Sequence, residues 1–235
     1  MAPVYSKMSQ AKKAQQKQNE RYANEPAIPL MRPKKPKYDA SELVKYECFH
    51  NPEDENNRSK YTISLPIFGG GTPEETLEWL KSAHKVIEGT SMHNPVKRHD
   101  FYLHMLTGDV KAVFANKSTE LGHWSIPNLR RCEESLIRHS FPHKALEYQK
   151  QYMQNMFIKP EGWTLRRFAT RLEEINNLLD KFPPFNQEMR GEKKLPRDEL
   201  ITIVTTGAPM EWQNKMICQN FDSDGKTTSE VLRVL

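Results

Sequence analysis

Cysteine is scarce in this sequence, and its three cysteines, Cys48, Cys132 and Cys218, lie far apart. None belongs to a Cys-x-x-Cys pair, which argues against a disulfide framework or a zinc site and favours reduced thiols in the cytosol. No apolar run approaches the roughly 18 residues that a membrane helix needs, and the first residues lack the apolar core of a signal peptide. We therefore expect a cytoplasmic protein without membrane contact.

Motifs for phosphate binding are also lacking. The glycine run Gly69–Gly71 is followed by Thr-Pro-Glu-Glu and not by the Lys-Ser/Thr of a phosphate-binding loop. Two carboxylates in the first helical turn would repel a phosphate. The segment instead predicts a helix start, with Thr72 as N-cap, Pro73 at the first helical position and Glu75 closing a capping box.

Other patterns that could hold a metal or a catalytic group are incomplete. Residues 220–231 resemble a calcium-binding loop, but Val231 stands where the bidentate glutamate is required. His139 and His143 are separated by Pro142, which breaks the helix that would align them. We interpret the eight histidines as surface or capping residues. We expect no metal, no cofactor, no small-molecule substrate and no enzymatic activity.

Positive charge is concentrated near the N-terminus. Residues 1–38 contain nine basic and two acidic side chains, a net charge of +7, whereas the whole chain carries +5 and the remainder therefore −2. One interpretation is a solvated, disordered arm. The other is a nucleic-acid-binding arm, because clustered Lys and Arg release phosphate counterions. The candidate nucleic-acid-binding residues are Lys7, Lys12, Lys13, Lys17, Arg21, Arg32, Lys34, Lys35 and Lys37.

Helical periodicity dominates the rest of the chain. Residues 61–68 alternate weakly and fit one short strand or an extended entry. Apolar side chains then recur with a period of 3.6 residues. The expected helices span residues 73–88, 94–106, 109–116, 125–141, 144–157, 162–180, 195–206, 210–220 and 229–235.

We predict an all-α fold with two small helical domains, residues 61–141 and 143–235. They meet at Phe141-Pro142 and follow a disordered basic arm or linker, residues 1–60.

The clearest helix carries Leu165, Phe168, Leu172, Ile175 and Leu179 at a 3-4-3-4 spacing. This spacing is typical of an ordinary core helix. It also fits a dimerising seam, in which the same stripe packs against a second copy. The two interpretations are not exclusive.

Three stretches recur in the order found in one known family. They are FGGGTPEETLEWLKSA at residues 68–83, residues 128–153, and residues 159–185 followed by 195–222. Together they resemble the capsid region of Gag polyproteins from LTR retrotransposons of the gypsy and copia classes. The resemblance spans about residues 65–222 and implies a retroviral capsid-like pair of helical domains.

Part of the third stretch is similar to the major homology region of retroviral capsids. Gly162, followed by Phe168-Ala169-Thr170-Arg171-Leu172, matches its order of glycine, aromatic, arginine and apolar residue. Glu161 replaces the usual glutamine, Leu165 stands near the position of an internal glutamate, and the spacing from glycine to aromatic is shorter. The resemblance therefore implies where this stretch lies in the fold, but it does not imply the full hydrogen-bond network of the major homology region. Gly162, Phe168, Arg171 and Leu172 are the candidate structural residues.

The resemblance implies a structural protein that self-assembles into a capsid, or virus-like particle, enclosing element RNA. Trp212 and Met216 are candidates for a contact between copies, and a core role fits them equally. The CCHC zinc knuckle common at the end of such proteins does not occur in this sequence. Two alternatives remain: a nucleic-acid-binding regulator acting as a small oligomer, and a domesticated Gag-derived protein with a cellular role.

Overall fold

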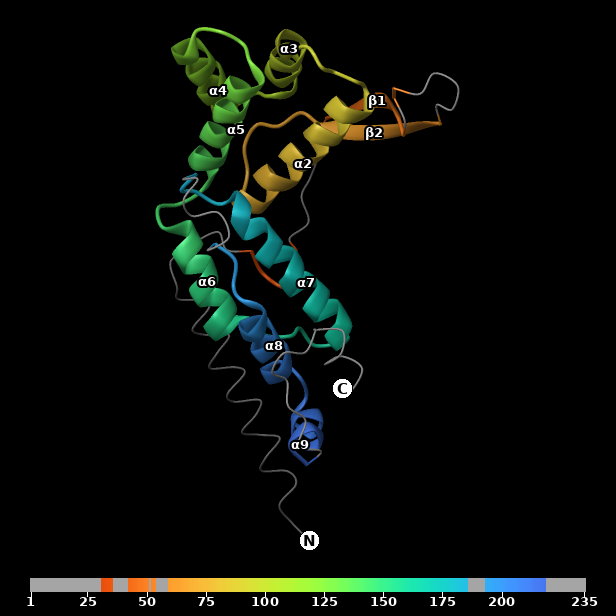
Figure 1. The fold of residues 1–235 in the computed structure, drawn as a ribbon, viewed down its shortest axis with the longest axis vertical. Coiled ribbons are helices and arrows are strands. Elements are labelled where there is room, and N and C mark those ends of the chain that lie inside the picture. The colour runs from red at the N-terminus through yellow and green to blue at the C-terminus, as the bar shows by residue number, and fades with distance from the viewer. Residues whose placement is uncertain (1–30, 36–41, 51, 54–58, 186–192, 219–235) are drawn as a thin grey trace.

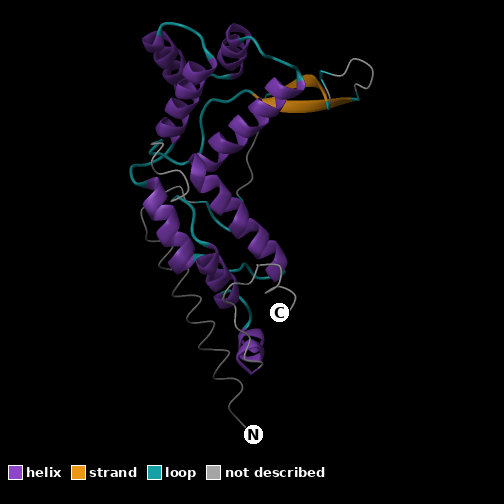
Figure 2. Cartoon of the chain, in the orientation of Figure 1, coloured by secondary structure: helices purple, strands orange, loops and turns teal. Residues whose placement is uncertain are grey.

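The computed structural model describes residues 31–35, 42–50, 52–53, 59–185 and 193–218 (Figure 1). Helices account for most of this part, and one antiparallel hairpin projects to the side (Figure 2). The predicted helical character is confirmed in this coarse form, and the hairpin is an addition to it.

The elements follow the labels of Figure 1. They are β1 (Leu43–Phe49), β2 (Lys60–Pro66), α2 (Pro73–Gly89), α3 (Pro95–Met105), α4 (Gly108–Leu121), α5 (Ile126–Ser140), α6 (Ala145–Met156), α7 (Leu165–Leu178), the short 3-10 helix η1 (Leu179–Lys181), α8 (Arg197–Thr206) and α9 (Met210–Cys218). Most of the predicted helix ranges within residues 73–206 agree closely with these bounds, but the helix expected at residues 109–116 ends five residues before α4 does. The helix expected at residues 229–235 lies outside the described residues.

The hairpin corrects the expectation of disorder up to residue 60. β1 and β2 pair antiparallel from Leu43 opposite Pro66 to Phe49 opposite Lys60. The Cys48 side chain is fully buried beside the end of α2, where Gly89 permits the approach because an added Cβ would lie 2.7 Å from Cys48 Cβ. The hairpin is thus held against the helices.

The start of α2 confirms the predicted capping box. Thr72 Oγ1 accepts from the Glu75 backbone N–H, and the Glu75 side chain accepts from the Thr72 N–H at 2.7 Å. Pro73 occupies the first helical turn. The preceding glycine-rich loop is pinned by Phe68, whose N–H donates to Met105 O at 2.8 Å and whose carbonyl accepts from Thr107 N–H. These contacts make the glycine run an entry into a helix.

The upper helical group, α2 to α5, packs around aromatic side chains. Trp79 stacks on Phe68 with ring centroids 5.2 Å apart and donates its indole N–H to Pro66 O at 2.8 Å. Tyr102 and Phe114 are fully buried, with ring centroids 5.1 Å apart. The chain then passes through Phe141 to the lower helical group, α6 to α9 (Figure 1).

The lower helical group is built on α7. All five residues of its 3-4-3-4 stripe are buried within the chain's own core, which confirms the core-helix interpretation. Phe168 stacks on Phe157 at 5.3 Å, and the Asn176 amide brackets the backbone of Leu195 with two hydrogen bonds, at 2.8 and 3.1 Å. A stripe committed to this core is not available as a seam.

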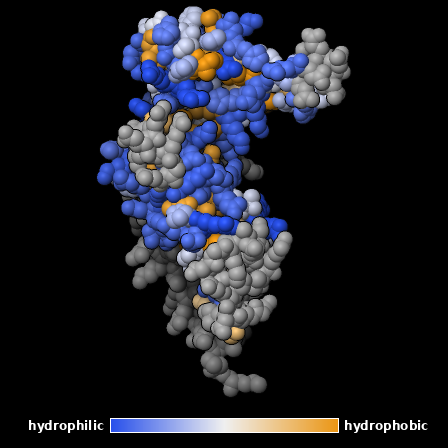
Figure 3. Space-filling view, in the orientation of Figure 1, coloured by the Kyte–Doolittle hydropathy of each residue, from blue (hydrophilic) through white to orange (hydrophobic). Residues whose placement is uncertain are grey.

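The two groups lie one above the other along the longest axis of the molecule, and the start of α2 meets α7 near the middle (Figure 1). Their buried apolar side chains form one connected cluster that runs from Met31 to Ala208. The division into two domains at Phe141-Pro142 stays a prediction. The face shown in Figure 3 is mainly hydrophilic, with apolar side chains scattered over it.

Candidate functional site

An ion cluster joins the two helical groups at the centre of the molecule. It begins with Glu74, which the capping of α2 places in the first helical turn and which is only 4% exposed. Arg171, on the middle of α7, donates through Nη2 to Glu74 Oε1 at 2.6 Å. Burial raises the pKa of Glu74, and the Arg171 charge opposes that shift.

The Arg171 guanidinium uses its other nitrogens as well. Nη1 donates to Glu174 Oε2 at 3.0 Å, and Nε and Nη2 donate to the carbonyl of Arg32 at 3.2 and 3.0 Å. A planar five-donor group suits this fork of acceptors, whereas lysine could not reproduce it. Arg171 therefore ties α7 to both α2 and the segment around Arg32.

Lys35 forms the outer part of the cluster. Its Nζ lies 2.6 Å from Glu78 Oε1 and 2.7 Å from Glu174 Oε1, with Glu74 Oε1 at 4.0 Å. Burial alone would lower the pKa of Lys35, but the hydrogen bonds to Glu174 and Glu78 outweigh it and the pKa is raised. Hydrogen bonds from Lys35 and Arg171 likewise lower the pKa of Glu174 against the effect of burial.

A buried amide holds the same segment at its other end. Gln149 of α6, 1% exposed, accepts from the Met31 N–H at 2.7 Å and donates to the Met31 carbonyl at 3.0 Å. The Met31 side chain is buried, as is Pro33. This is the second correction to the predicted disorder of residues 1–60. The signal that sequence reasoning missed is a short apolar interruption, Pro-Leu-Met-Arg-Pro, within a basic stretch.

The predicted nucleic-acid-binding residues fall into three classes. Lys35 is paired within the chain, Arg32 and Lys34 are exposed, and the other six lie outside the described residues. The six are Lys7, Lys12, Lys13, Lys17, Arg21 and Lys37. Lys35 is thus paired with carboxylates of its own chain. For the other eight basic residues, a role in nucleic-acid binding stays a prediction.

The residues proposed from the major homology region lie on or beside α7. Phe168 and Leu172 are fully buried and Arg171 is 4% exposed. Gly162 precedes the helix with φ of 76°, a left-handed conformation that favours glycine, and a Cβ there would meet nothing within 4 Å. The structure brings Phe168, Arg171 and Leu172 together on the helix, and Gly162 serves the turn before it.

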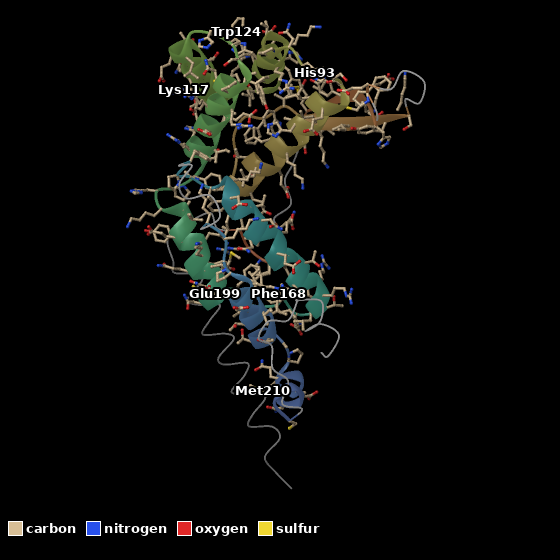
Figure 4. The ribbon with its side chains drawn as sticks, viewed as in Figure 1. His93, Lys117, Trp124, Phe168, Glu199 and Met210 are labelled. Atoms are coloured by element: carbon tan, nitrogen blue, oxygen red, sulfur yellow. The ribbon has the colours of Figure 1, made fainter. Side chains whose placement is uncertain are left out.

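The candidate interface residues, Trp212 and Met216, belong to α9. Their side chains lie outside what the structure describes. Met210, at the start of the same helix, is the most exposed large apolar side chain in the described part, at 67% (Figure 4). A contact between copies through α9 therefore stays a prediction.

Ser118, His99 and Asp100 form the arrangement most similar to a catalytic one. His99 Nε2 lies 2.9 Å from Ser118 Oγ, and His99 Nδ1 lies 3.5 Å from Asp100 Oδ1. However, the imidazole stacks against Trp124 at 4.5 Å, and Ser118 Oγ accepts from Trp124 Nε1 at 3.2 Å. Both Ser118 and His99 are buried, so a substrate carbonyl could not reach the hydroxyl.

We assign this cluster to anchoring the indole of Trp124 onto α3 and α4. The expectation that all histidines lie on the surface or cap helices is wrong for His99, which is buried. The missed signal is the neighbouring Phe101-Tyr102, which marks this stretch of α3 as core.

A second polar cluster ties α2, α3 and α5 together. The Tyr102 hydroxyl donates to Glu133 Oε1 at 2.6 Å, and His84 Nε2 lies 3.0 Å from the same oxygen. Burial would raise the pKa of Glu133, but hydrogen bonds from His84 and Tyr102 lower it. Burial and the Glu133 charge raise the pKa of Tyr102 well above its usual value. With the carboxylate ionised and the phenol protonated, the cluster stabilises the packing of three helices.

The described residues provide no metal site, and burial raises the pKa of the two buried cysteines, Cys48 and Cys132. No group of three or more His, Cys, Asp and Glu side chains there could hold a metal ion. Burial raises the pKa of the Cys132 thiol to about 11, which suppresses the nucleophilic thiolate. None of the described helices is long and apolar enough to cross a bilayer.

Comparisons with protein-family models, with curated proteins and with solved structures find no match to this chain.

Proposed function

We propose that this chain is a structural subunit, a Gag-like capsid protein that assembles with copies of itself and encloses RNA. The burial of Arg171 carries the proposal. Arginine is almost never fully buried unless it is paired, and this one occupies the arginine position of the stretch similar to the major homology region. Its bonds to Glu74 and the Arg32 carbonyl hold the two helical groups in one arrangement.

The distribution of exposed apolar side chains also supports assembly. Trp124 lies at the upper end of the molecule and Met210 at the lower end (Figure 4). Val96, on α3, and Ile126, at the start of α5, are also exposed on the upper helical group. Small apolar contacts at opposite ends suit a lattice, in which weak interfaces repeated many times close a shell through avidity.

The proposal is tested on the purified full chain by light scattering and negative-stain electron microscopy. Measurements cover low to high salt, with and without RNA. Shells or tubes support assembly, and their dependence on RNA shows whether RNA nucleates them. A stable monomer or dimer under every condition, still binding RNA through residues 1–38, would overturn self-assembly and favour the nucleic-acid-binding regulator.

A matched pair of variants locates the contact. Met210→Glu places a charge on an exposed apolar position of α9, where folding should be little affected. It should lower the yield of particles at least tenfold if α9 joins copies. Asn214→Glu, at an exposed polar position of the same helix, is the control and should assemble as the unchanged chain does. Equal yields from both variants would exclude the Met210 surface.

A further inference from the structure

Residues 31–35, Met-Arg-Pro-Lys-Lys, are held like a bound peptide. We call this segment the strap, and the side chains that hold it the strap site: Glu74, Glu78, Gln149, Arg171 and Glu174. Those side chains come from α2, α6 and α7. The strap therefore lies where the upper and lower helical groups meet.

The strap site recognises both backbone and side chains. Gln149 pairs with the N–H and the carbonyl of Met31, as a neighbouring strand would. The Arg171 guanidinium binds the next carbonyl, that of Arg32. Apolar burial of Met31 and the carboxylates around Lys35 add sequence specificity at the two ends. A simple connecting segment would require none of these contacts.

The strap is held in its site by residues that are distant in sequence, and not by contacts with its own neighbours along the chain. The polar partners that hold it are 39 to 139 residues further along the chain. The hydrogen bonds and ion pairs would be the same if a second copy supplied the strap, which is the condition for exchange of an element between protomers. Residues 36–41 connect the strap to Glu42, and seven peptide units span at most about 25 Å. A neighbouring copy within that distance can receive it.

We propose that the strap site accepts the strap of a second copy of this chain, so that two copies exchange residues 31–35 reciprocally. This exchange would be one of the contacts within the proposed assembly. It rests on that proposal, because assembly supplies the high local concentration of copies that favours the intermolecular state. The interaction itself requires only two chains.

Charge reversal distinguishes a strap bound in its own chain from a strap exchanged with a second copy. One chain carries Lys35→Glu, so that its strap is repelled by its own Glu78 and Glu174. The other carries Glu78→Lys, so that its site repels its own Lys35. Only in an exchanged mixed pair does Lys35 meet an unchanged site while the strap with Lys35→Glu meets the opposite charge of Glu78→Lys, with Glu174 still beside that second contact. Lys35 and Glu78 are each 37% exposed at the side chain, so both chains should fold, and circular dichroism checks this.

The readout is retention of an untagged chain by a tagged one at low salt. The mixed pair should be retained at least tenfold more than either variant with an untagged copy of itself. Lys34→Glu, at the exposed neighbouring position, replaces Lys35→Glu in the control and should give only the background level. Equal retention of mixed and identical pairs overturns the exchange.

A peptide measurement provides an independent test. A fluorescent peptide of residues 29–37 should bind the Lys35→Glu chain at least tenfold more tightly than the same peptide with Met31→Asp. Equal affinities of the two peptides would show that the strap site does not recognise the strap sequence when another molecule supplies it. Electron microscopy is scored separately. Particles without preferential pairing overturn exchange alone, and pairing without particles overturns the proposed assembly alone.

Discussion

Arg171 Nη2 lies 2.6 Å from Glu74 Oε1, and this contact joins α7 to α2 across 97 residues of sequence. Both side chains are about 95% removed from solvent. Both charges have lost their hydration and interact with each other instead. The carbonyl of Arg32 and the carboxylate of Glu174 accept the remaining hydrogen bonds of the Arg171 guanidinium. The contact between Glu74 and Arg171 is the buried ion pair that joins the upper and lower helical groups.

Removing the guanidinium should be strongly destabilising. Arg171→Leu leaves the Glu74 carboxylate buried without its partner and the Arg32 carbonyl without its donors. The free energy of unfolding should fall by about 3–5 kcal/mol, measured by urea denaturation. Arg166→Ala, at an exposed position of the same helix, is the control and should change it by less than about 0.5 kcal/mol.

The double variant Glu74→Leu with Arg171→Leu tests whether the loss comes from the isolated carboxylate. It removes both charges and should recover part of the stability lost in the single variant. A double variant less stable than Arg171→Leu alone would contradict this explanation. The loss would then come from the remaining bonds of Arg171, to Arg32 and Glu174.

Stability should depend on pH through Glu133. Its folded pKa is lowered from 4.5, so its contribution is present above that ordinary value and is lost as the pH falls through the lowered one. The free energy of unfolding should therefore decrease from about pH 6 to about pH 3, with part of the decrease due to Glu133. Glu133→Gln should flatten the profile. Glu134→Gln, one residue along α5, should not.

Gly162 should tolerate asparagine better than alanine. With φ at 76°, alanine would be strained by about 1–2 kcal/mol, although the space around a Cβ is open. Asparagine visits the left-handed region more readily and should cost less. Thermal and urea unfolding of Gly162→Ala and Gly162→Asn measure the difference. Equal losses would indicate a requirement other than backbone conformation.

RNA binding should distinguish the lysines of the basic arm. If residues 1–38 bind single-stranded RNA, replacing Lys12, Lys13 and Lys17 with alanine should weaken binding. It should also reduce the slope of log K against log salt by about 2, at about 0.7 per phosphate contact. Lys35→Ala should leave the slope unchanged because Lys35 is already paired with Glu78 and Glu174.

Fluorescence anisotropy with labelled RNA at several salt concentrations measures both quantities. A reduced slope for Lys35→Ala would show that the ion cluster opens on binding. An unchanged slope for the triple variant would exclude these three lysines as phosphate contacts.

The helices could be predicted because their signals are local. The period of α7, the break at Phe141-Pro142 and the Thr72–Glu75 capping box each involve residues within a few positions of one another. β1 was missed although Val44, Tyr46 and Cys48 alternate with polar residues. Its neighbours on both sides are polar and rich in proline or charge, and the strand becomes stable only by pairing with β2 and packing beside α2.

Less of the central site could be predicted. The resemblance singled out Phe168, Arg171 and Leu172, but it did not identify what Arg171 binds. Glu74 was interpreted as an ordinary first-turn carboxylate, and Lys35 as one basic residue among nine. Gln149 could not be predicted as part of the site, because the sequence pattern is the same whether a helical glutamine faces water or bonds to the Met31 backbone.

The sequence by itself determined the helical character of this protein, the start of α2 and the core stripe of α7, because period and capping depend on neighbours within one or two turns. The tertiary structure alone decided which charges leave water. Glu74 and Arg171 pair across 97 residues, and Lys35 pairs with Glu78 and Glu174 across 43 and 139 residues. A buried ion pair is stable only where the fold brings opposite charges and spare hydrogen-bond acceptors to one point.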